Sequence, residues 1–250
     1  MLEIFNLLYK VYLDQFMSTP PKLELIYLNV RALAEAPQMI MHYAHIPYSY
    51  KMAWDYYGEP WINQKKNAPF NQLPILIIND KIQIWQSGAI VRYIANVANI
   101  TPKDPILLAY ADAIFESTQE LQSPLNPTIN LYTEEKFKEF RDKLINNILP
   151  KKFYNFDRLL KKFSGNFFLG DDPYYCDFAA YHYFEMALLL DKNILNDFTS
   201  IKNHMDTLTS LNGIKKYLNS RPEIINIGIN PKMKINGIET QTGANPFKKN

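Results

Sequence analysis

The 250-residue sequence predicts a small α/β domain of βαβ-ββα order, followed by an all-α helical domain. Three observations carry this prediction. Apolar residues alternate from Leu23 onward, an apolar, mostly β-branched run fills residues 75–78, and after Pro105 apolar residues recur at helical spacing. Strands that alternate with helices are typical of an α/β layer, whereas helical periodicity alone is typical of a helix bundle.

The first elements of the α/β domain follow from periodicity. The alternation over residues 23–28 has a period of two, as in a strand. Residues 32–44 are expected to form a helix, in which Pro37 is tolerated because it lies in the first turn. The segment from His45 onward ends this helix, and a second strand begins near Tyr48.

A polar and aromatic loop over residues 54–66 is expected to lead to the second half of this domain. Residues 75–85 are predicted to form an antiparallel hairpin, because Asn79 and Asp80 are turn formers between two strand-like runs. A helix is expected over residues 87–98, where the strand pattern ends.

The second half of the chain carries helical patterns. The clearest are apolar series over residues 137–148, 179–190 and 201–218, the last in two shorter pieces. Asp172, which is followed by Pro173, is predicted to cap the start of the helix that contains residues 179–190.

We therefore divide the chain into five segments. They are an N-terminal extension (1–21), an α/β domain (22–99), a linker (100–104), a helical domain (105–222) and a C-terminal tail (223–250). The tail has little periodicity and is expected to follow the surface or to lie loosely. The extension lacks the basic start and uninterrupted apolar core of a signal peptide, and we assign it no function.

Composition and charge exclude several classes of protein. A hydrophobic fraction of 47% allows a large core. A net charge of +2 gives no basic face for nucleic acid, and no stretch reaches the roughly 18 apolar residues of a membrane-spanning helix. The lone Cys176 excludes an internal disulfide and favours a reducing compartment, so a cytoplasmic protein is expected.

Motifs for several other chemistries are missing. The eight glycines form no dinucleotide or nucleotide phosphate loop, and there is neither a nucleophile elbow nor a zinc-protease motif. We interpret His42 and His45 as surface or capping residues. No metal site and no tightly bound cofactor are expected.

Several short motifs between residues 22 and 222 form a recognisable set. They are Leu25 to Asn29 with Arg31 and Ala34-Glu35, His42 to Tyr48, Asn71 to Pro74, Gln86 to Ile90 with Arg92-Tyr93, Gly170-Asp171, Asp177-Phe178, His204 to Asp206 and Ile214 to Pro222. This set resembles the glutathione transferase family, and the tyrosine in the first strand resembles its sigma-like, tyrosine-type classes. The resemblance implies a thioredoxin-like first domain, a homodimer and glutathione as co-substrate.

The resemblance implies a site for the γ-Glu-Cys-Gly tripeptide, and the residue types suit it. Gln86 and Ser87 start a helix whose free N–H groups and positive dipole end can hold the γ-glutamyl carboxylate. Leu73 can pair with the peptide backbone through its own main chain if Pro74 is cis. The remaining contacts, near the glycyl carboxylate, are Trp61, Lys65 and Gln72.

Tyr27 is the predicted catalytic residue and also a contact to glutathione. A thiol with a pKa near ~8.5 is mostly protonated at neutral pH, whereas the thiolate is the nucleophile. A phenol O–H donated to the sulfur stabilises the thiolate. One such bond contributes about 1.5 to 3 kcal/mol, which corresponds to a fall of about one to two units in the thiol pKa.

The resemblance further implies that Glu120 reaches the glutathione of a neighbouring subunit. Apolar residues of segment 109–131 are expected to line a pocket for a small hydrophobic electrophile. Leu33 departs from the family pattern, because it stands where an arginine is usual. Two alternatives stay open: a glutathione-dependent isomerase or peroxidase of lipid or prostaglandin type, and a non-catalytic structural or ligand-binding relative.

Overall fold

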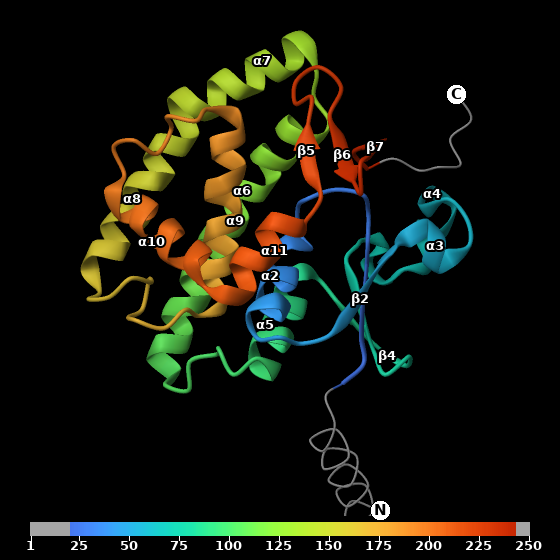
Figure 1. Ribbon diagram of the computed structural model, residues 1–250, viewed down its shortest axis with the longest axis horizontal. Helices are drawn as coiled ribbons and strands as arrows, with labels where there is room; N and C mark the ends of the chain where they lie inside the picture. Colours follow the sequence, from blue (N-terminus) through green and yellow to red (C-terminus); the bar gives the residue numbers. More distant parts are fainter. Residues whose placement is uncertain (1–20, 244–250) are drawn as a thin grey trace, which may run out of the picture.

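The computed structural model describes residues 21–243, which Figure 1 shows in two parts. A small sheet with its helices, in blue to teal, lies beside a larger group of helices in green to orange. Residues 1–20 of the predicted N-terminal extension lie outside the described residues, and so do residues 244–250 of the predicted tail.

A four-stranded mixed sheet forms the centre of the first domain. Its order is β2-β1-β3-β4, with β1 parallel to β2 and antiparallel to β3, while β3 and β4 form the predicted hairpin. The strands are β1 (Leu23–Tyr27), β2 (Tyr48–Met52), β3 (Ile75–Ile78) and β4 (Ile82–Trp85). Ile26 in β1 is fully buried although it falls between the alternating positions, because this central strand is covered on both faces.

The helices of the first domain confirm two predictions and overturn one. Helix α2 (Glu35–Tyr43) and helix α5 (Ser87–Val97) lie where the sequence predicts them. The predicted loop over residues 54–66 is wrong, because α3 (Ala53–Tyr57) and α4 (Trp61–Gln64) occupy most of it. A helix of four or five residues is little more than one turn, so it shows no repeating period and depends on tertiary packing.

Between residues 105 and 220 the second domain is built from helices, as predicted. The first of them starts at Asp104, whose carboxylate accepts the N–H groups of Ile106 and Leu107 at 2.9 Å each. The helices are α6 (Pro105–Asn130), α7 (Glu134–Lys143), α8 (Leu149–Lys162), α9 (Tyr175–Leu190), α10 (Thr199–Ser210) and α11 (Asn212–Ser220). A π-helical turn over residues 144–148 joins α7 to α8.

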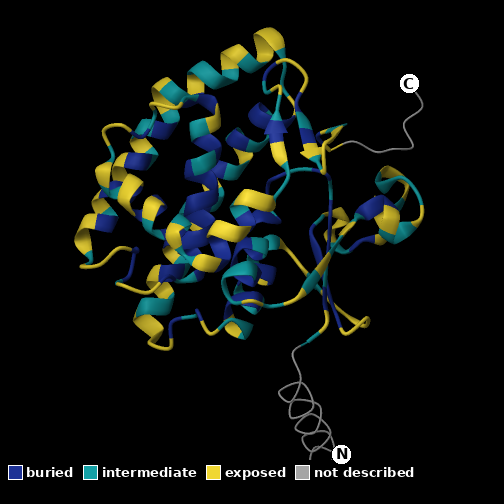
Figure 2. Ribbon diagram, in the orientation of Figure 1, coloured by how far each residue is buried: buried dark blue, intermediate teal, exposed yellow. Residues whose placement is uncertain are grey.

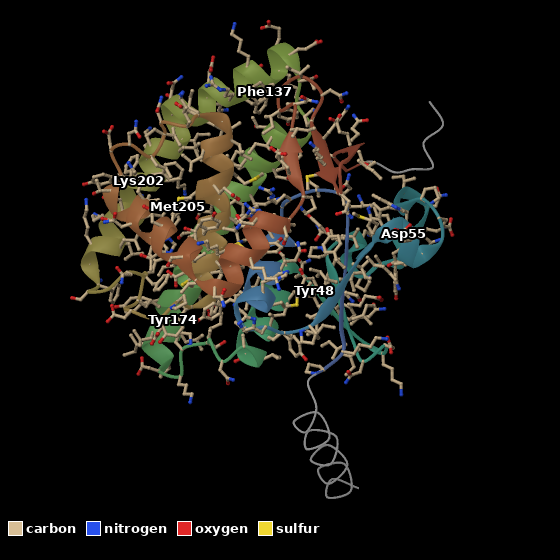
Figure 3. The ribbon with its side chains drawn as sticks, in the orientation of Figure 1. Tyr48, Asp55, Phe137, Tyr174, Lys202 and Met205 are labelled. Atoms are coloured by element: carbon tan, nitrogen blue, oxygen red, sulfur yellow. The ribbon has the colours of Figure 1, made fainter. Side chains whose placement is uncertain are left out.

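The N-terminus of the central helix α9 corrects another prediction. Asp172 does not cap it; the N-cap is Tyr174, labelled in Figure 3, and the capping carboxylate belongs to Asp177 in the first turn. Asp177 accepts the N–H groups of Tyr174 at 2.9 Å and Phe168 at 3.0 Å, and it lies 3.0 Å from Nε2 of His204. The backbone is still extended at Tyr174, so Asp172 comes two residues too early to cap.

Residues 223–241 form a second sheet, where the sequence analysis predicted an irregular tail. Its antiparallel strands are β5 (Glu223–Ile225), β6 (Lys232–Ile235) and β7 (Ile238–Gln241), drawn in red in Figure 1. Strands of three or four residues are too short to show a clear alternation in sequence. Burial of Ile224 and Met233 attaches them to the main core.

Close packing and buried ion pairs join the two domains. A Cβ atom on Gly213 of α11 would clash with the carbonyl oxygen of His42 in α2, so only glycine fits this crossing. Arg221, just after α11, pairs with both Glu35 of α2 and Glu185 of α9. Figure 2 shows buried residues in both parts of the molecule, and one core cluster spans them. Arg31, in the loop between β1 and α2, also pairs with Glu185 at 3.6 Å, so this loop is held against the helical domain.

Candidate functional site

A cavity of about 360 Å³ lies where the end of β1 meets the start of α5. Small-molecule sites typically have volumes of ~300 to 1,000 Å³. The residues that line the cavity are Tyr27, Leu28, Leu33, Trp61, Lys65, Pro69, Asn71, Gln72, Leu73, Pro74, Gln86, Ser87 and Gln122. Every residue that the sequence analysis assigned to the tripeptide is among them except Glu120.

Tyr27, the last residue of β1, lines this cavity although only 5% of its surface is exposed. The backbone N–H of Leu33 donates a hydrogen bond to its hydroxyl oxygen. Burial raises the pKa of Tyr27 well above its ordinary value, and this hydrogen bond offsets only part of the effect. The phenol is therefore neutral at physiological pH, and its O–H remains a hydrogen-bond donor.

The start of α5 has the features of a carboxylate site. Gln86 has a φ of +67°, and Ser87 is the first helical residue. The N–H groups of a first turn have no partners within the helix, and they lie at the positive end of its dipole. The side-chain amide of Gln86 donates to Oε1 of Gln72 at 3.1 Å, so the two glutamines are held together at the cavity. A ligand carboxylate fits these donors.

An indole and an ammonium group form another part of the wall. Trp61 begins α4, and Lys65 lies one turn later, in the 3₁₀ turn that follows. The ring of Trp61 lies 5.9 Å from that of Tyr57, measured between centroids, and this contact restrains its orientation. Both side chains line the cavity, as their spacing of four residues allows.

The main chain before β3 has the cis proline on which the predicted pairing of Leu73 with the tripeptide backbone depends. The peptide bond between Leu73 and Pro74 is cis. The ladder between β1 and β3 starts at Ile75, so the backbone of Leu73 lies before the paired residues and beside the cavity.

Five lining residues were not assigned to the site from sequence. They are Leu28, Pro69, Asn71, Gln122 and Leu33. The first three are close neighbours in sequence of assigned residues, so proximity along the chain was a usable signal. Gln122 comes from α6, and only the packing of the two domains brings it here. Leu33 presents an apolar side chain beside Tyr27, at the position where the resemblance implied that an arginine is missing.

Glu120 lies outside this cavity. Its exposed carboxylate pairs with Lys152 of α8, and both line a separate cavity of about 240 Å³ between α6 and α8. The other residues that line the second cavity are Tyr110, Ala113, Ile114, Ser117, Asn155, Phe156, Leu159 and Phe163. Of the apolar residues of segment 109–131 expected to surround the electrophile, Tyr110, Ala113 and Ile114 line the second cavity, and the first cavity receives only Gln122 from α6.

Two further findings concern residues 21–243. No helix among them is both long and apolar enough to cross a membrane. No three His, Cys, Asp or Glu side chains in that range gather into a group that could hold a metal ion.

Comparison with known proteins identifies both domains. Residues 23–96 match the family model described as the glutathione S-transferase N-terminal domain, and residues 119–221 match that of the glutathione S-transferase C-terminal domain. A glutathione S-transferase of Plasmodium yoelii yoelii is 32% identical over 199 residues, which cover 78% of this chain and 92% of the relative.

Solved structures show the same fold. The Pi-class glutathione S-transferase of Onchocerca volvulus aligns with a TM-score of 0.70 at 26% identity, over 79% of this chain and 92% of that one. Prostaglandin synthase D of Nilaparvata lugens aligns with a TM-score of 0.69 at 22% identity, over 81% of this chain and 100% of that one. The first domain is therefore thioredoxin-like and the second is the helical domain found with it.

Proposed function

This chain belongs to the glutathione S-transferase family, and on this premise we propose that it conjugates glutathione, bound in the cavity at Tyr27, to small hydrophobic electrophiles. The observation that carries the proposal is the convergence of eight assigned residues from four segments on one cavity. They are Tyr27, Trp61, Lys65, Gln72, Leu73, Pro74, Gln86 and Ser87.

The donors around the cavity support one orientation of the tripeptide. The γ-glutamyl carboxylate lies at the first turn of α5, where Ser87 and the free N–H groups receive it. The backbone of the cysteinyl residue runs beside Leu73, and the glycyl carboxylate lies near Trp61 and Lys65. This orientation leaves the sulfur at Tyr27.

The proposed chemistry needs one proton removed and one bond made. The glutathione thiol loses its proton to water, and the thiolate attacks an electrophilic carbon, forming a C–S bond as a leaving group departs or a double bond takes up a proton. Tyr27 keeps its own proton and donates a hydrogen bond to the sulfur. The oxygen of Tyr27 accepts from the N–H of Leu33, which leaves its own O–H available for the sulfur.

Binding and turnover by the wild-type protein test this proposal. We expect glutathione to bind in calorimetry at millimolar concentration or below, and the protein to accelerate thiol conjugation to an aryl halide. No binding at millimolar glutathione would sink the proposal. Binding without conjugation would favour a non-catalytic relative, whereas turnover only of lipid peroxides would favour the glutathione-dependent isomerase or peroxidase.

A homodimer is the second part of the proposal, and Phe70 supports it. Phe70 lies in the 3₁₀ turn before β3, has a φ of +56° and is 65% exposed, and its ring makes an edge contact with Trp85 at 6.3 Å between centroids. The cavity between α6 and α8 is rich in apolar and aromatic groups. In a two-fold dimer each Phe70 inserts into this cavity of the partner, because a symmetric interface uses the same two patches twice.

The same arrangement explains the position of Glu120. Phe70 is two residues from Gln72, which lines the glutathione cavity, and Glu120 lines the cavity that receives the partner's ring. Insertion of the ring therefore brings the partner's Glu120 towards the Gln72 side of the glutathione site. There its carboxylate can accept the glutathione amino group.

We expect Phe70→Ser to weaken the dimer by roughly 30-fold or more, the effect of losing about 2 kcal/mol at an aromatic hot spot. Sedimentation equilibrium measures the change. Ile62→Ser is the matched control, since Ile62 is 73% exposed but lies on α4. If the wild type is a monomer, the proposed dimer and the proposed role of Glu120 are both wrong. If the two substitutions weaken the dimer equally, Phe70 is not the residue that inserts into the partner.

The family membership and the buried, unpaired thiol of Cys176 support a place in the reducing cytosol. Glutathione is abundant as a thiol in such a compartment.

A further inference from the structure

The C-terminal segment returns to the active-site loop. Asn29, two residues after Tyr27, donates its side-chain amide to the carbonyl of Gln241 at 3.3 Å, and its own carbonyl accepts the N–H of Gly243 at 2.8 Å. The loop over residues 28–33 therefore contacts the end of the second sheet through both its side chain and its main chain.

Thr242 connects the same segment to the helical domain. Its hydroxyl donates to the carbonyl of Asn130, the last residue of α6, and its backbone N–H donates to that of Pro231 at 3.1 Å. Asn29 is 3% exposed and Thr242 is 6% exposed. Buried polar groups cost free energy unless they are paired, so this register of the segment is specific.

The segment is also attached to the loop at its beginning. The guanidinium of Arg31 donates to the carbonyl of Pro222, the residue before β5. At the far end of the sheet, Phe137 of α7, labelled in Figure 3, fills the space beside Gly228, where no Cβ would fit. Residues 222–243, which we name the C-terminal clasp, thus bind the loop at both ends and rest on α6 and α7.

This loop controls the geometry at Tyr27. Leu28 lines the glutathione cavity, and the N–H of Leu33 bonds the Tyr27 hydroxyl. Tyr50 of β2 donates to the carbonyl of Leu28 at 2.8 Å, which restrains the loop from the sheet side. The clasp supplies the restraint from the opposite, helical side.

We propose that the C-terminal clasp is a positioning element of the reaction, which keeps the loop over residues 28–33 in the conformation that directs the Tyr27 hydroxyl to the sulfur. The inference rests on the proposed function. The clasp and the glutathione contacts use different residues. The groups proposed to hold the two carboxylates of glutathione, at Trp61, Lys65 and Ser87, lie on α4, on the turn after it and on α5, whereas the hydrogen bonds described above join the clasp to Asn29, Arg31 and Asn130. Loosening the clasp weakens thiolate stabilisation and leaves glutathione binding nearly unchanged.

Thr242→Val tests the clasp, because valine keeps the shape and removes the hydroxyl. We expect the pKa of the bound thiol to rise by about half a unit to one unit, and kcat at neutral pH to fall about threefold to tenfold, since one unit is tenfold in thiolate. The KM for glutathione should stay within about twofold, because the contacts that bind glutathione before and during the reaction are unchanged. Thr242→Ser, which retains the hydroxyl, should restore both values.

A control and a second variant make the test specific. Lys232→Ala breaks the exposed pair of Lys232 and Glu239 on the same sheet, and we expect no change in thiol pKa. Asn29→Ala removes the side-chain contact to Gln241 and should act like Thr242→Val. It also decides the question if the valine variant does not fold.

The outcomes distinguish the clasp from the proposed function. If the wild type conjugates glutathione and Tyr27→Phe slows it, but Thr242→Val and Asn29→Ala keep the wild-type thiol pKa and kcat, the clasp is only structural and the inference is wrong. A rise in KM alone would also overturn it. If the wild type neither binds nor conjugates glutathione, the proposed function fails, and the clasp inference fails with it.

Discussion

Tyr27→Phe is expected to lower the rate of glutathione conjugation at neutral pH by about 10- to 100-fold, with little change in the KM for glutathione. The substitution removes one hydrogen bond to a charged sulfur, which contributes about 1.5 to 3 kcal/mol. It leaves the ring, which packs in the core, in place. The substitution weakens stabilisation of the thiolate but not binding of the tripeptide, so the fall in rate appears in kcat and not in KM.

The rate of conjugation should depend on pH through the pKa of the bound thiol. Activity rises with pH as the bound thiol ionises, so a stabilised thiolate places that rise below the ordinary thiol pKa of ~8.5. In Tyr27→Phe the rise shifts to higher pH by about one to two units, and the two proteins approach equal rates above it. Burial keeps the pKa of Tyr27 itself too high for its ionisation to contribute to the wild-type profile.

Tyr183→Phe is the matched control for this experiment. Tyr183 is a buried tyrosine near Tyr27, but its hydroxyl donates to Gln119 at 3.3 Å and does not line the cavity. We expect its pH profile to match that of the wild type. A Tyr27→Phe variant that reacts as fast as the wild type at neutral pH would refute the mechanism and leave the fold assignment intact.

Asp177→Ala should produce the largest loss of stability, about 3 to 5 kcal/mol in the free energy of unfolding. Asp177 is fully buried and satisfies the N–H groups of Phe168 and Tyr174 and the ring of His204. Removing it leaves the N–H groups of Phe168 and Tyr174 and the ring of His204 without their common partner, and each buried group left unsatisfied typically costs about 1 to 3 kcal/mol. Urea unfolding followed by circular dichroism measures the change.

Asp172→Ala is the natural comparison, because the sequence analysis predicted the cap at that residue. Asp172 is exposed and the structure gives it no capping bond, so we expect an effect within about 0.5 kcal/mol. If Asp172→Ala destabilised the protein as much as Asp177→Ala, the capping arrangement described above would be wrong. Asp177→Asn should fall between the two, because it retains an acceptor.

Local chemistry predicted the elements with strong periodic patterns. The alternation from Leu23 located β1, the turn residues Asn79 and Asp80 located the β3–β4 hairpin, and the apolar spacing around Ile201 located α10 and α11. The short helices α3 and α4 were missed because one turn has no period. The capping carboxylate of α9 was predicted at Asp172 instead of Asp177, because the sequence offers an acid at both positions. Only the extended backbone at Tyr174 shows that the helix begins after it and that Asp177 is the capping residue.

The candidate site likewise contains residues that local motifs predict and residues that only tertiary packing brings there. Residues from Tyr27 to Ser87 could be assigned because their motifs are local, whereas Gln122 and the separate position of Glu120 depend on how α6 packs against the first domain. The second sheet is decided entirely by tertiary structure, since its short strands gain order from burial of Ile224 and Met233 and from the bonds of Asn29 and Thr242.

Sequence alone thus predicted the residues of the candidate site and determined that an α/β domain precedes a helical one, because hydrophobic period and local motifs act within a few residues. Tertiary structure decided that Tyr27 is buried and neutral, that Glu120 lies outside the cavity of its own chain, and that the C-terminal segment binds the loop beside Tyr27. These properties arise from contacts between residues far apart in the chain. The free energy of such contacts cannot be inferred from a local sequence pattern.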